Sequence, residues 1–551
     1  MGFNELTIKV LTDETQEFWN YRRSLNSCLL QVICYSQRVL STQARGRVTK
    51  ISCASEVRPA SAGPPRIMDD FQNNSALGNL AGGFHALCEL LLVAALSVPA
   101  LAQTRPEGQL RAIAWPPYQD ETVQLMHEYL RINTSNPPGN ELAAAEFFHR
   151  LFERAGISNT IYPYAPGRAD FYAVLKGDGT LRPLILLNHM DVVQAVPSGW
   201  RLPPFSGEIL NGEMYGRGAQ DMKDEGLLQA MAMLVAARQH LPLKRDLIFL
   251  ATSDEEVDGT GSRWILENHP ELVRNAEYLI TEGGSNLIIK GRGTIYEVGV
   301  GEKAPYWLRL TATGRGGHGS IPIRDSAPNR LVKALAQMVE WEAPIHLLPS
   351  VEQYFRVIAA LEPEPRAAQF RDIRKALQDP EFARRMSRDE EYNFLLRDTV
   401  SLTVLHASNQ TNVIPDTAYA ELDVRLLPDE DPKVFESQLR SALADSSIQI
   451  TFANRFKPPN SSSTDTSLYR LIEQVVHQYN PRAIVAPALG GGYTESQMYR
   501  PLGITCYGFN TMEVTAEVDA TEHAANERVP VEQLRRGVKV LYELVARAAN
   551  Q

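Results

Sequence analysis

The sequence has little cysteine, no apolar run long enough to span a bilayer and no excess of positive charge. Of its five cysteines, Cys28, Cys34, Cys53 and Cys88 precede residue 90, and only Cys506 lies beyond it. A chain that keeps Cys506 alone forms no internal disulfide and no thiolate zinc cluster, so His and carboxylate side chains must hold any metal. The formal net charge of -10 argues against nucleic acid and anionic membranes as partners.

An apolar run from Leu90 to Ala102 is too short for a stable membrane span. It suits the hydrophobic region of a signal peptide with the cleavage site Ala100-Leu101-Ala102, which predicts a secreted or periplasmic protein that begins near Gln103. A buried helix is the alternative, and the protein is cytoplasmic if the segment is not processed. We therefore interpret 1–102 as an N-terminal extension with a signal-peptide-like segment at about 86–102.

Beyond this extension the chain alternates between helical and strand patterns. The predicted helices are Glu121–Arg131, Glu141–Ala155, Leu227–His240 and Trp264–Arg274. The predicted strands are the apolar runs Leu184–Leu187, Leu247–Ala251 and Tyr278–Ile280. Uniformly apolar strands separated by helices indicate an α/β fold whose sheet is covered on both faces.

Polar motifs follow each of the three predicted strands. They are Asn188-His189-Met190-Asp191, Ser253-Asp254-Glu255-Glu256 and Thr281-Glu282-Gly283-Gly284. Because open α/β sheets bind ligands at the carboxyl ends of their strands, we expect these side chains to meet at one edge. The loop Gly216–Lys223 adds the carboxylate of Asp221, and Glu522–Glu527 adds a late histidine. Carboxylates crowded in this way repel one another unless cations neutralise them, which predicts a metal site.

Other catalytic patterns are missing from these segments. The glycine-rich loop lacks the spacing of a dinucleotide-binding or phosphate-binding fingerprint, and we find no Ser or Cys nucleophile elbow.

As a set, the motifs resemble those of the M20 metallopeptidase family over about residues 115–545. The resemblance implies an α/β zinc-peptidase catalytic domain with an inserted α+β sandwich that serves as lid and dimerisation domain. We place the catalytic domain at 103–302 and 460–551 and the lid at 303–459. The implied reaction is hydrolysis of a peptide or N-acyl amide bond next to a free carboxylate, in a homodimer formed through the lid. The longer lid and the Thr281–Gly284 motif are similar to the carboxypeptidase S and N-acyl amino acid hydrolase branch.

The resemblance also implies two zinc ions per subunit. His189 and Glu282 would bind one ion, Glu256 and His523 the other, and Asp221 would bridge the two. Zinc accepts imidazole and carboxylate ligands and leaves a position open for water, while Co²⁺ or Mn²⁺ can replace it.

Two further carboxylates are given roles by the same resemblance. Glu255 would be the general base that activates the water bound by the two zinc ions and then passes its proton to the leaving amine. A third metal ligand or a passive anion is the alternative for Glu255. Asp191 would hold the imidazole of His189 in its tautomer.

The predicted lid contains two alternating strands, at 306–313 and 418–425, and two helices, Ala327–Trp341 and Pro432–Leu443. Residues 343–400 read as a helical, charged insertion, and the sequence assigns it no role.

Four residues are expected to contact the substrate. His318, in Gly316–Ser320, would hydrogen-bond the oxyanion, often from the partner subunit, and a surface histidine that stabilises a turn is the alternative. Asn412 and Arg425 match positions that contact the substrate carboxylate, although Arg425 is equally compatible with a solvated strand face. Gly491, within Gly490–Gly492, would offer a backbone N–H to the same carboxylate.

The sequence departs from the family pattern at two places near the site. Asp224 replaces a common Gly, and Tyr493-Thr494-Glu495 stands where Thr-Asp is more usual. All five presumed ligands and Glu255 are present, which argues against a non-catalytic, metal-stabilised binding protein, the alternative from another class. An N-acyl amino acid deacylase would share the whole mechanism with a peptidase.

Overall fold

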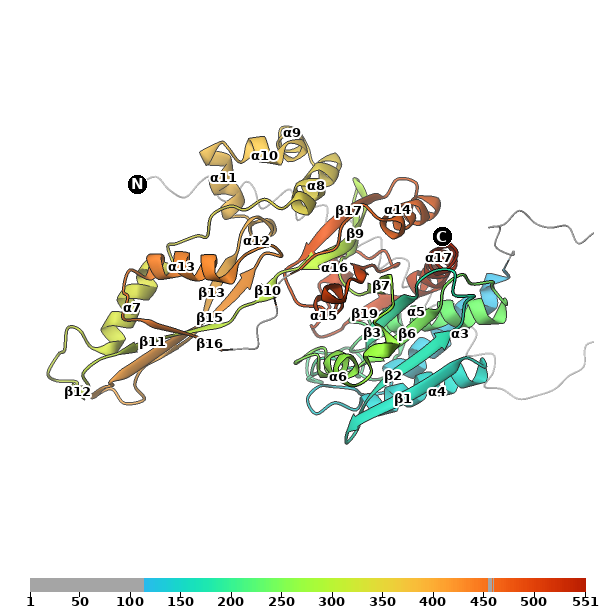
Figure 1. Ribbon diagram of the computed structural model, residues 1–551, viewed down its shortest axis with the longest axis horizontal. Helices are drawn as coiled ribbons and strands as arrows, with labels where there is room; N and C mark the ends of the chain where they lie inside the picture. The colour runs from blue at the N-terminus through green and yellow to red at the C-terminus, as the bar shows by residue number, and fades with distance from the viewer. Residues whose placement is uncertain (1–112, 454–457, 459) are drawn as a thin grey trace, which may run out of the picture. The chain divides into compact units, whose positions relative to one another are not determined.

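The computed structural model describes residues 113–453, 458 and 460–551 (Figure 1). The signal-peptide-like segment and its cleavage site lie outside this part of the chain. Among the described helices, none combines the length and the apolar character that crossing a membrane requires.

Nine of the described strands form one mixed sheet in the order β1-β2-β6-β3-β7-β18-β9-β17, and β8 pairs with β9. The four strands in the middle of this order, β6, β3, β7 and β18, run parallel to one another. The bounds are β1 (Ser158–Ala165), β2 (Arg168–Leu175), β3 (Leu184–His189), β6 (Leu247–Thr252), β7 (Tyr278–Thr281), β8 (Asn286–Ile289), β9 (Gly293–Glu302), β17 (Ile484–Gly490) and β18 (Thr505–Gly508).

Helices cover both faces of this sheet, as the apolar strands predicted. In β3, Leu184 and Leu186 pack with one group of helices and Ile185 and Leu187 with another, because side chains alternate between the faces of a strand. The first group is α3 (Trp115–Leu130), α4 (Glu141–Arg154), α5 (Lys223–Arg238), α14 (Ser467–Tyr479) and α17 (Val531–Ala548). The second is α6 (Thr260–Asn268) and α15 (Ser496–Tyr499), followed by η3 (Arg500–Leu502). The α/β fold is confirmed.

Two predicted helices were too long. The helix expected over Ala327–Trp341 ends at Met338. The helix expected over Trp264–Arg274 ends at Asn268, and a separate turn of 3-10 helix, η1 (Pro270–Leu272), follows. His269 takes a non-helical conformation because the ring of Pro270 disfavours the helical region for the residue before it.

A small sheet and a short helix complete the same part of the molecule. The strands β4 (Ile209–Leu210), β5 (Glu213–Tyr215) and β19 (Arg528–Pro530) pair in the order β19-β5-β4, and α16 (Ala516–Asp519) precedes β19. The pairing of β19 with β5 joins the glycine-rich loop after β5 to the C-terminal segment.

A separate antiparallel sheet lies within the predicted lid. Its strands pair in the order β10-β15-β11-β16, and β13 also pairs with β15. The helices α7 and α13 pack on one face of this sheet. The bounds are β10 (Ala304–Pro305), β11 (Leu308–Thr313), α7 (Ala327–Met338), β13 (Thr399–His406), β15 (Thr417–Leu426), α13 (Pro432–Leu443) and β16 (Gln449–Phe452). A two-stranded ribbon joins β12 (Gly317–His318) to β14 (Val413–Ile414). The boundaries of this domain at 303 and 459 remain a proposal.

The segment between α7 and β13 is helical, as expected, although the predicted range 343–400 runs two residues into β13, which begins at Thr399. We call residues 343–398 the helical insertion; it contains α8 (Pro349–Ile358), η2 (Ala359–Leu361), α9 (Arg366–Arg371), α10 (Ile373–Ala376), α11 (Pro380–Ser387) and α12 (Asn393–Leu396).

Candidate metal centre and active site

Three neighbouring strands bring the predicted ligands to one edge of the main sheet. His189 is the last residue of β3, Glu256 follows β6, and Glu282 comes directly after β7. Since β3 lies between β6 and β7 and all three are parallel, their carboxyl ends meet at one edge. Asp221 lies two residues before α5, which packs behind β3.

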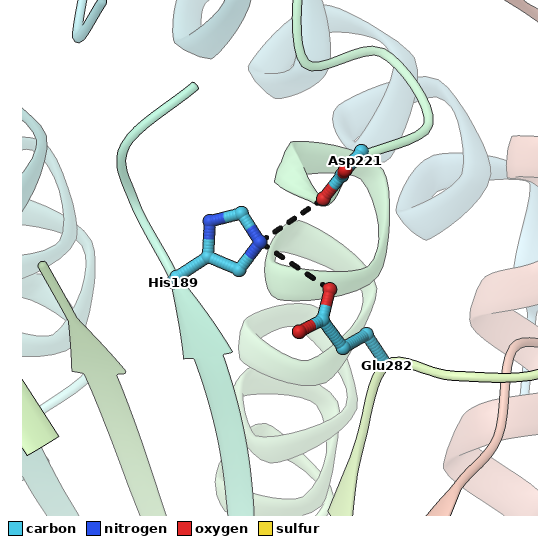
Figure 2. A group of neighbouring side chains, drawn as sticks. All are labelled: His189, Asp221 and Glu282. Atoms are coloured by element: carbon cyan, nitrogen blue, oxygen red, sulfur yellow. Dashed lines mark hydrogen bonds and ion pairs between the residues drawn. The ribbon is translucent and has the colours of Figure 1, made fainter. Parts of the chain in front are cut away.

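The first group of possible ligands is His189, Asp221 and Glu282 (Figure 2). The Nε2 atom of His189 lies 3.0 Å from Oδ1 of Asp221 and 3.3 Å from Oε2 of Glu282. The other ring nitrogen, Nδ1, lies 3.0 Å from the backbone carbonyl oxygen of Asp191. A proton on Nδ1 that is donated to this carbonyl leaves the lone pair of Nε2 directed at the two carboxylates, which is the tautomer that binds a cation.

The second group is Asp221, Glu256 and His523. The Nε2 atom of His523 lies 2.8 Å from Oδ2 of Asp221 and 3.3 Å from Oε2 of Glu256. Asp221 therefore belongs to both groups and contributes a different oxygen to each. Within each group the ligand atoms all lie within 4.8 Å of one another.

The chemistry of these groups fits two divalent cations. Although burial opposes the charged imidazole, the carboxylates of Glu282 and Asp221 raise the pKa of His189 well above its usual value. The hydrogen bonds with Asp221 and Glu256 raise the pKa of His523 to about 10. The negative charge thus attracts protons onto both imidazoles, and metal ions can take the place of those protons.

Asp191 holds the turn that carries Glu255 and Glu256. Its two carboxylate oxygens accept the backbone N–H of Glu255 at 3.1 Å and that of Glu256 at 3.2 Å. The amide of Asn136 donates to the same carboxylate at 2.8 Å. The contact of Asp191 with the His189 ring runs through the backbone carbonyl at 3.0 Å, while the carboxylate is 3.7 Å away. The side chain of Asp191 therefore positions the glutamate turn more directly than it positions the imidazole.

Glu255 belongs to neither ligand group, and it lines the cavity beside them. Burial, followed by the neighbouring carboxylate of Glu282, raises the pKa of Glu255 well above its usual range. A carboxylate beside the ligands but outside both groups has the position that a proton acceptor needs.

A cavity of about 690 Å³ opens over both groups. Its wall combines Asp221, Glu256, Glu282 and His523 of the two groups with residues of the predicted lid, including Pro305, Trp307 and Arg425. Gly490 and Gly492 line it as well, while Gly491 lies between them at the surface. The guanidinium of Arg425 is held by Asp423, with 2.7 Å between Nε and Oδ1.

The sequence also matches a known protein family. The model of Peptidase family M20/M25/M40 matches residues 185–547. The chain belongs to this family. The predicted resemblance to M20 enzymes is confirmed, and the chain is an enzyme of the metallopeptidase and amidohydrolase type.

Curated relatives and solved structures share most of the chain. Bovine N-fatty-acyl-amino acid synthase/hydrolase PM20D1 is 30% identical over 426 residues, which is 74% of this chain and 83% of the relative. Human aminoacylase-1 is 27% identical over 444 residues, 79% of this chain and 97% of the relative. An M20 family metallo-carboxypeptidase, Sso-CP2 from Sulfolobus solfataricus, has a TM-score of 0.59 at 20% identity and covers 78% of this chain and 99% of its own. Human carnosine dipeptidase 1 has a TM-score of 0.56 at 17% identity over 79% of this chain and 97% of its own.

Two predicted residues lie apart from the cavity of this M20 chain. His318 and Asn412 are exposed at the β12–β14 ribbon, where the N–H of Gly319 donates to the carbonyl of Asn412 at 2.7 Å. Neither residue lines the cavity. The single chain therefore brings together the five predicted ligands, Asp191, Glu255 and Arg425, but not His318 and Asn412.

Glu527 holds together two segments of the candidate site, and the sequence analysis did not assign it this role. It is fully buried, pairs with Arg217, and accepts the backbone N–H groups of Gly218 at 2.9 Å and Gln220 at 2.8 Å. It thus ties the loop that carries Asp221 to the segment that carries His523. Both partners lie inside motifs that already supplied a proposed ligand, but no local pattern in the sequence pairs them.

The two departures from the family pattern are both buried. Asp224 has no exposed surface, and burial raises its pKa well above the usual value. Glu495 accepts the hydroxyl of Thr252 at 2.6 Å, and burial raises its pKa to about 7.

Proposed function

We propose that this enzyme uses two zinc ions to hydrolyse the amide bond of N-acyl amino acids that carry a free carboxylate. The observation that carries the proposal is the pair of ligand groups that share Asp221, with Glu255 beside them in one cavity. The names of the curated relatives support the substrate class, because both an N-fatty-acyl-amino acid hydrolase and an aminoacylase match most of the chain.

The residues divide into metal ligands and a proton acceptor. His189 and Glu282 would hold one ion, Glu256 and His523 the other, and Asp221 both. When bound, zinc lowers the pKa of water and polarises a carbonyl. Glu255 accepts the proton of the attacking water and delivers it to the nitrogen of the leaving amino acid.

The leaving amino acid is bound on the lid side of the cavity. The guanidinium of Arg425 suits its carboxylate because the two can form parallel hydrogen bonds, and the ion pair with Asp423 sets the direction of the guanidinium. The backbone at Gly490–Gly492 is the second candidate contact for this carboxylate, since Gly490 and Gly492 line the cavity.

His318 and Asn412 would act in the site of a second copy of the chain. Both are exposed on one ribbon of the lid and lie away from the cavity of their own chain. In a homodimer formed through the lid, His318 would donate a hydrogen bond to the oxyanion and Asn412 would contact the substrate carboxylate.

Cleavage of dipeptides is a second candidate, and one observation favours it. Asp519 and Glu522 also line the cavity, and a carboxylate there suits the free ammonium group that a dipeptide carries and an N-acyl amino acid lacks.

The test is hydrolysis of a mixed panel of dipeptides and N-acyl amino acids by zinc-loaded protein. We expect cleavage that a chelator abolishes, with N-acyl amino acids preferred. The variant Glu255→Gln should keep two zinc ions and turn over at least about a hundredfold more slowly, since it lacks the proton acceptor. A wild-type protein that binds zinc but cleaves no member of the panel, or that binds no zinc, would contradict the proposal.

We also propose that the protein is exported. The support is the apolar run that ends in Ala100-Leu101-Ala102. N-terminal sequencing of secreted or periplasmic material should find a first residue at or near Gln103, and an uncleaved protein in the cytosol would contradict export.

A further inference from the structure

The helical insertion interrupts the lid in sequence, but its helix α8 packs against the nine-stranded sheet of the catalytic domain, which we call the catalytic sheet. Val351 and Phe355 of α8 share a buried cluster with Ile295 of β9 and Ala486 of β17, and Figure 1 shows α8 beside β17. The hydroxyl of Tyr354 donates to the carboxylate of Glu297 in β9 at 3.0 Å. Burial of several large apolar side chains makes this a stable contact.

The C-terminal end of the insertion is tied to the lid sheet. The carboxylate of Asp398 accepts the backbone N–H of Leu427, directly after β15, at 2.7 Å. At the other end, the ring of His346 lies 3.2 Å from the carboxylate of Asp429. The insertion therefore contacts both the catalytic sheet and the lid.

Lys303 joins this insertion to the connection between β9 and the lid. Its side chain has no exposed surface, and its ammonium group donates to the carbonyl oxygens of Phe394 at 3.1 Å and Arg397 at 2.8 Å. The third acceptor is the hydroxyl of Thr399 at 2.9 Å. Three acceptors match the three N–H groups of an ammonium. Burial lowers the pKa of Lys303 to about 7, and the nearby carboxylate of Asp398 opposes this shift.

The backbone of Lys303 holds the wall of the cavity at the same time. Its N–H donates to the carbonyl of Gly490 at 2.9 Å, and its carbonyl accepts the side-chain amide of Gln497 at 3.3 Å. Gly490 and Gln497 both line the cavity. The preceding residue, Glu302, is fixed by Arg500, with 2.9 Å between Oε1 and Nη2.

We propose that Lys303 is a positioning residue through which the helical insertion sets the place of the Gly490–Gly492 loop. The insertion thus stabilises the part of the cavity that binds the leaving amino acid. This last statement rests on the proposed function. Because Lys303 contacts the loop and not the metal ligands, its loss should weaken substrate binding more than it slows the chemical step.

The experiment compares Lys303→Met, which keeps the aliphatic stem, with the wild-type full chain. We expect KM for an N-acyl amino acid to rise about tenfold while kcat changes by less than about twofold, because only the binding wall shifts. Lys303→Arg keeps the charge and several donors and should recover part of the loss. Thr399→Val removes one acceptor and should produce a smaller change in the same direction, which provides a test if Lys303→Met does not fold.

Hydrogen exchange supplies a readout that does not depend on activity. In Lys303→Met, amides at 394–399 and 490–497 should exchange faster, whereas those of β3 and α5 should not change. The control Lys333→Met removes an exposed lysine of the lid helix and should alter neither KM nor exchange. A uniform rise in exchange with KM unchanged would overturn the proposal. If the wild type cleaves no N-acyl amino acid, the proposed function fails, and the exchange pattern alone decides whether Lys303 couples the insertion to the loop.

Discussion

The carboxylate of Asp191 accepts the backbone N–H of Glu255, with 3.1 Å between Oδ1 and N. This contact links the end of β3 to the turn after β6, and it fixes the backbone from which the proposed proton acceptor projects. Asp191 therefore makes two different contacts: its carboxylate holds the backbone of Glu255, and its backbone carbonyl accepts from the ring of His189.

Asp191→Asn distinguishes these roles. In the variant, an amide NH2 group replaces one carboxylate oxygen and cannot accept the backbone N–H that this oxygen accepts. The backbone carbonyl that is hydrogen-bonded to His189 does not change. We expect both metals to remain and kcat to fall by about one to two orders of magnitude, since catalytic groups tolerate little displacement. Metal analysis and steady-state kinetics check this. Loss of zinc with kcat per bound metal unchanged would show that Asp191 acts mainly on the imidazole.

Because Asp221 belongs to both ligand groups, we expect its substitution to remove more metal than substitution of a ligand that belongs to one group. Glu256→Gln should lose one ion and keep the other, whereas Asp221→Ala should lose both because each ligand group includes one of its oxygens. Mass spectrometry of the dialysed protein counts the ions. Asp258→Asn, which removes an exposed carboxylate two residues after Glu256, is the matched control and should keep both. Two ions in Asp221→Ala would refute the bridging role.

The positions of His318 and Asn412 predict complementation between inactive subunits. His318→Ala and Glu255→Gln should each be nearly inactive alone. Random mixing of the two variants should restore about a quarter of wild-type activity, because half of the dimers are mixed and each mixed dimer has one complete site. Co-expression with two different affinity tags isolates the mixed dimers, which should have about half of wild-type activity because one of their two sites is complete. No gain over the separate variants would indicate that His318 does not act across a dimer interface.

Glu495 predicts a pH dependence of stability in the metal-free protein. Burial raises its pKa in the folded state to about 7 from a value of 4.5, so the folded protein holds a proton that the unfolded chain releases. The stabilising contribution is fully present below pH 4.5 and is lost as the pH rises through about 7. Glu495→Gln should weaken this decline and be relatively more stable above pH 7. Urea unfolding in the presence of a chelator, measured from pH 4.5 to 8 for both proteins, tests the difference, and parallel curves would rule it out.

The sequence predicted those parts of the candidate site that lie at the ends of apolar strands. His189 and Glu282 follow apolar runs, and such runs form buried parallel strands whose carboxyl ends share one edge. The role of Glu527 was not predictable in the same way, although its motif was noticed, because its partner Arg217 lies 310 residues away in the chain. The predicted helix Trp264–Arg274 was too long. Apolar residues continue at helical spacing past His269-Pro270, but the backbone does not remain helical there.

By itself, the sequence determined the α/β fold, since periodicity is a local property of the chain. The proposed ligand set came from the resemblance of the motifs to those of the M20 family. Only the tertiary structure decided that Asp191 supports the glutamate turn, that Arg425 reaches the cavity while His318 and Asn412 do not, and that the helical insertion packs on the catalytic sheet. These features depend on contacts between segments far apart in sequence. Such contacts follow from how whole elements pack, which no local pattern of residues specifies.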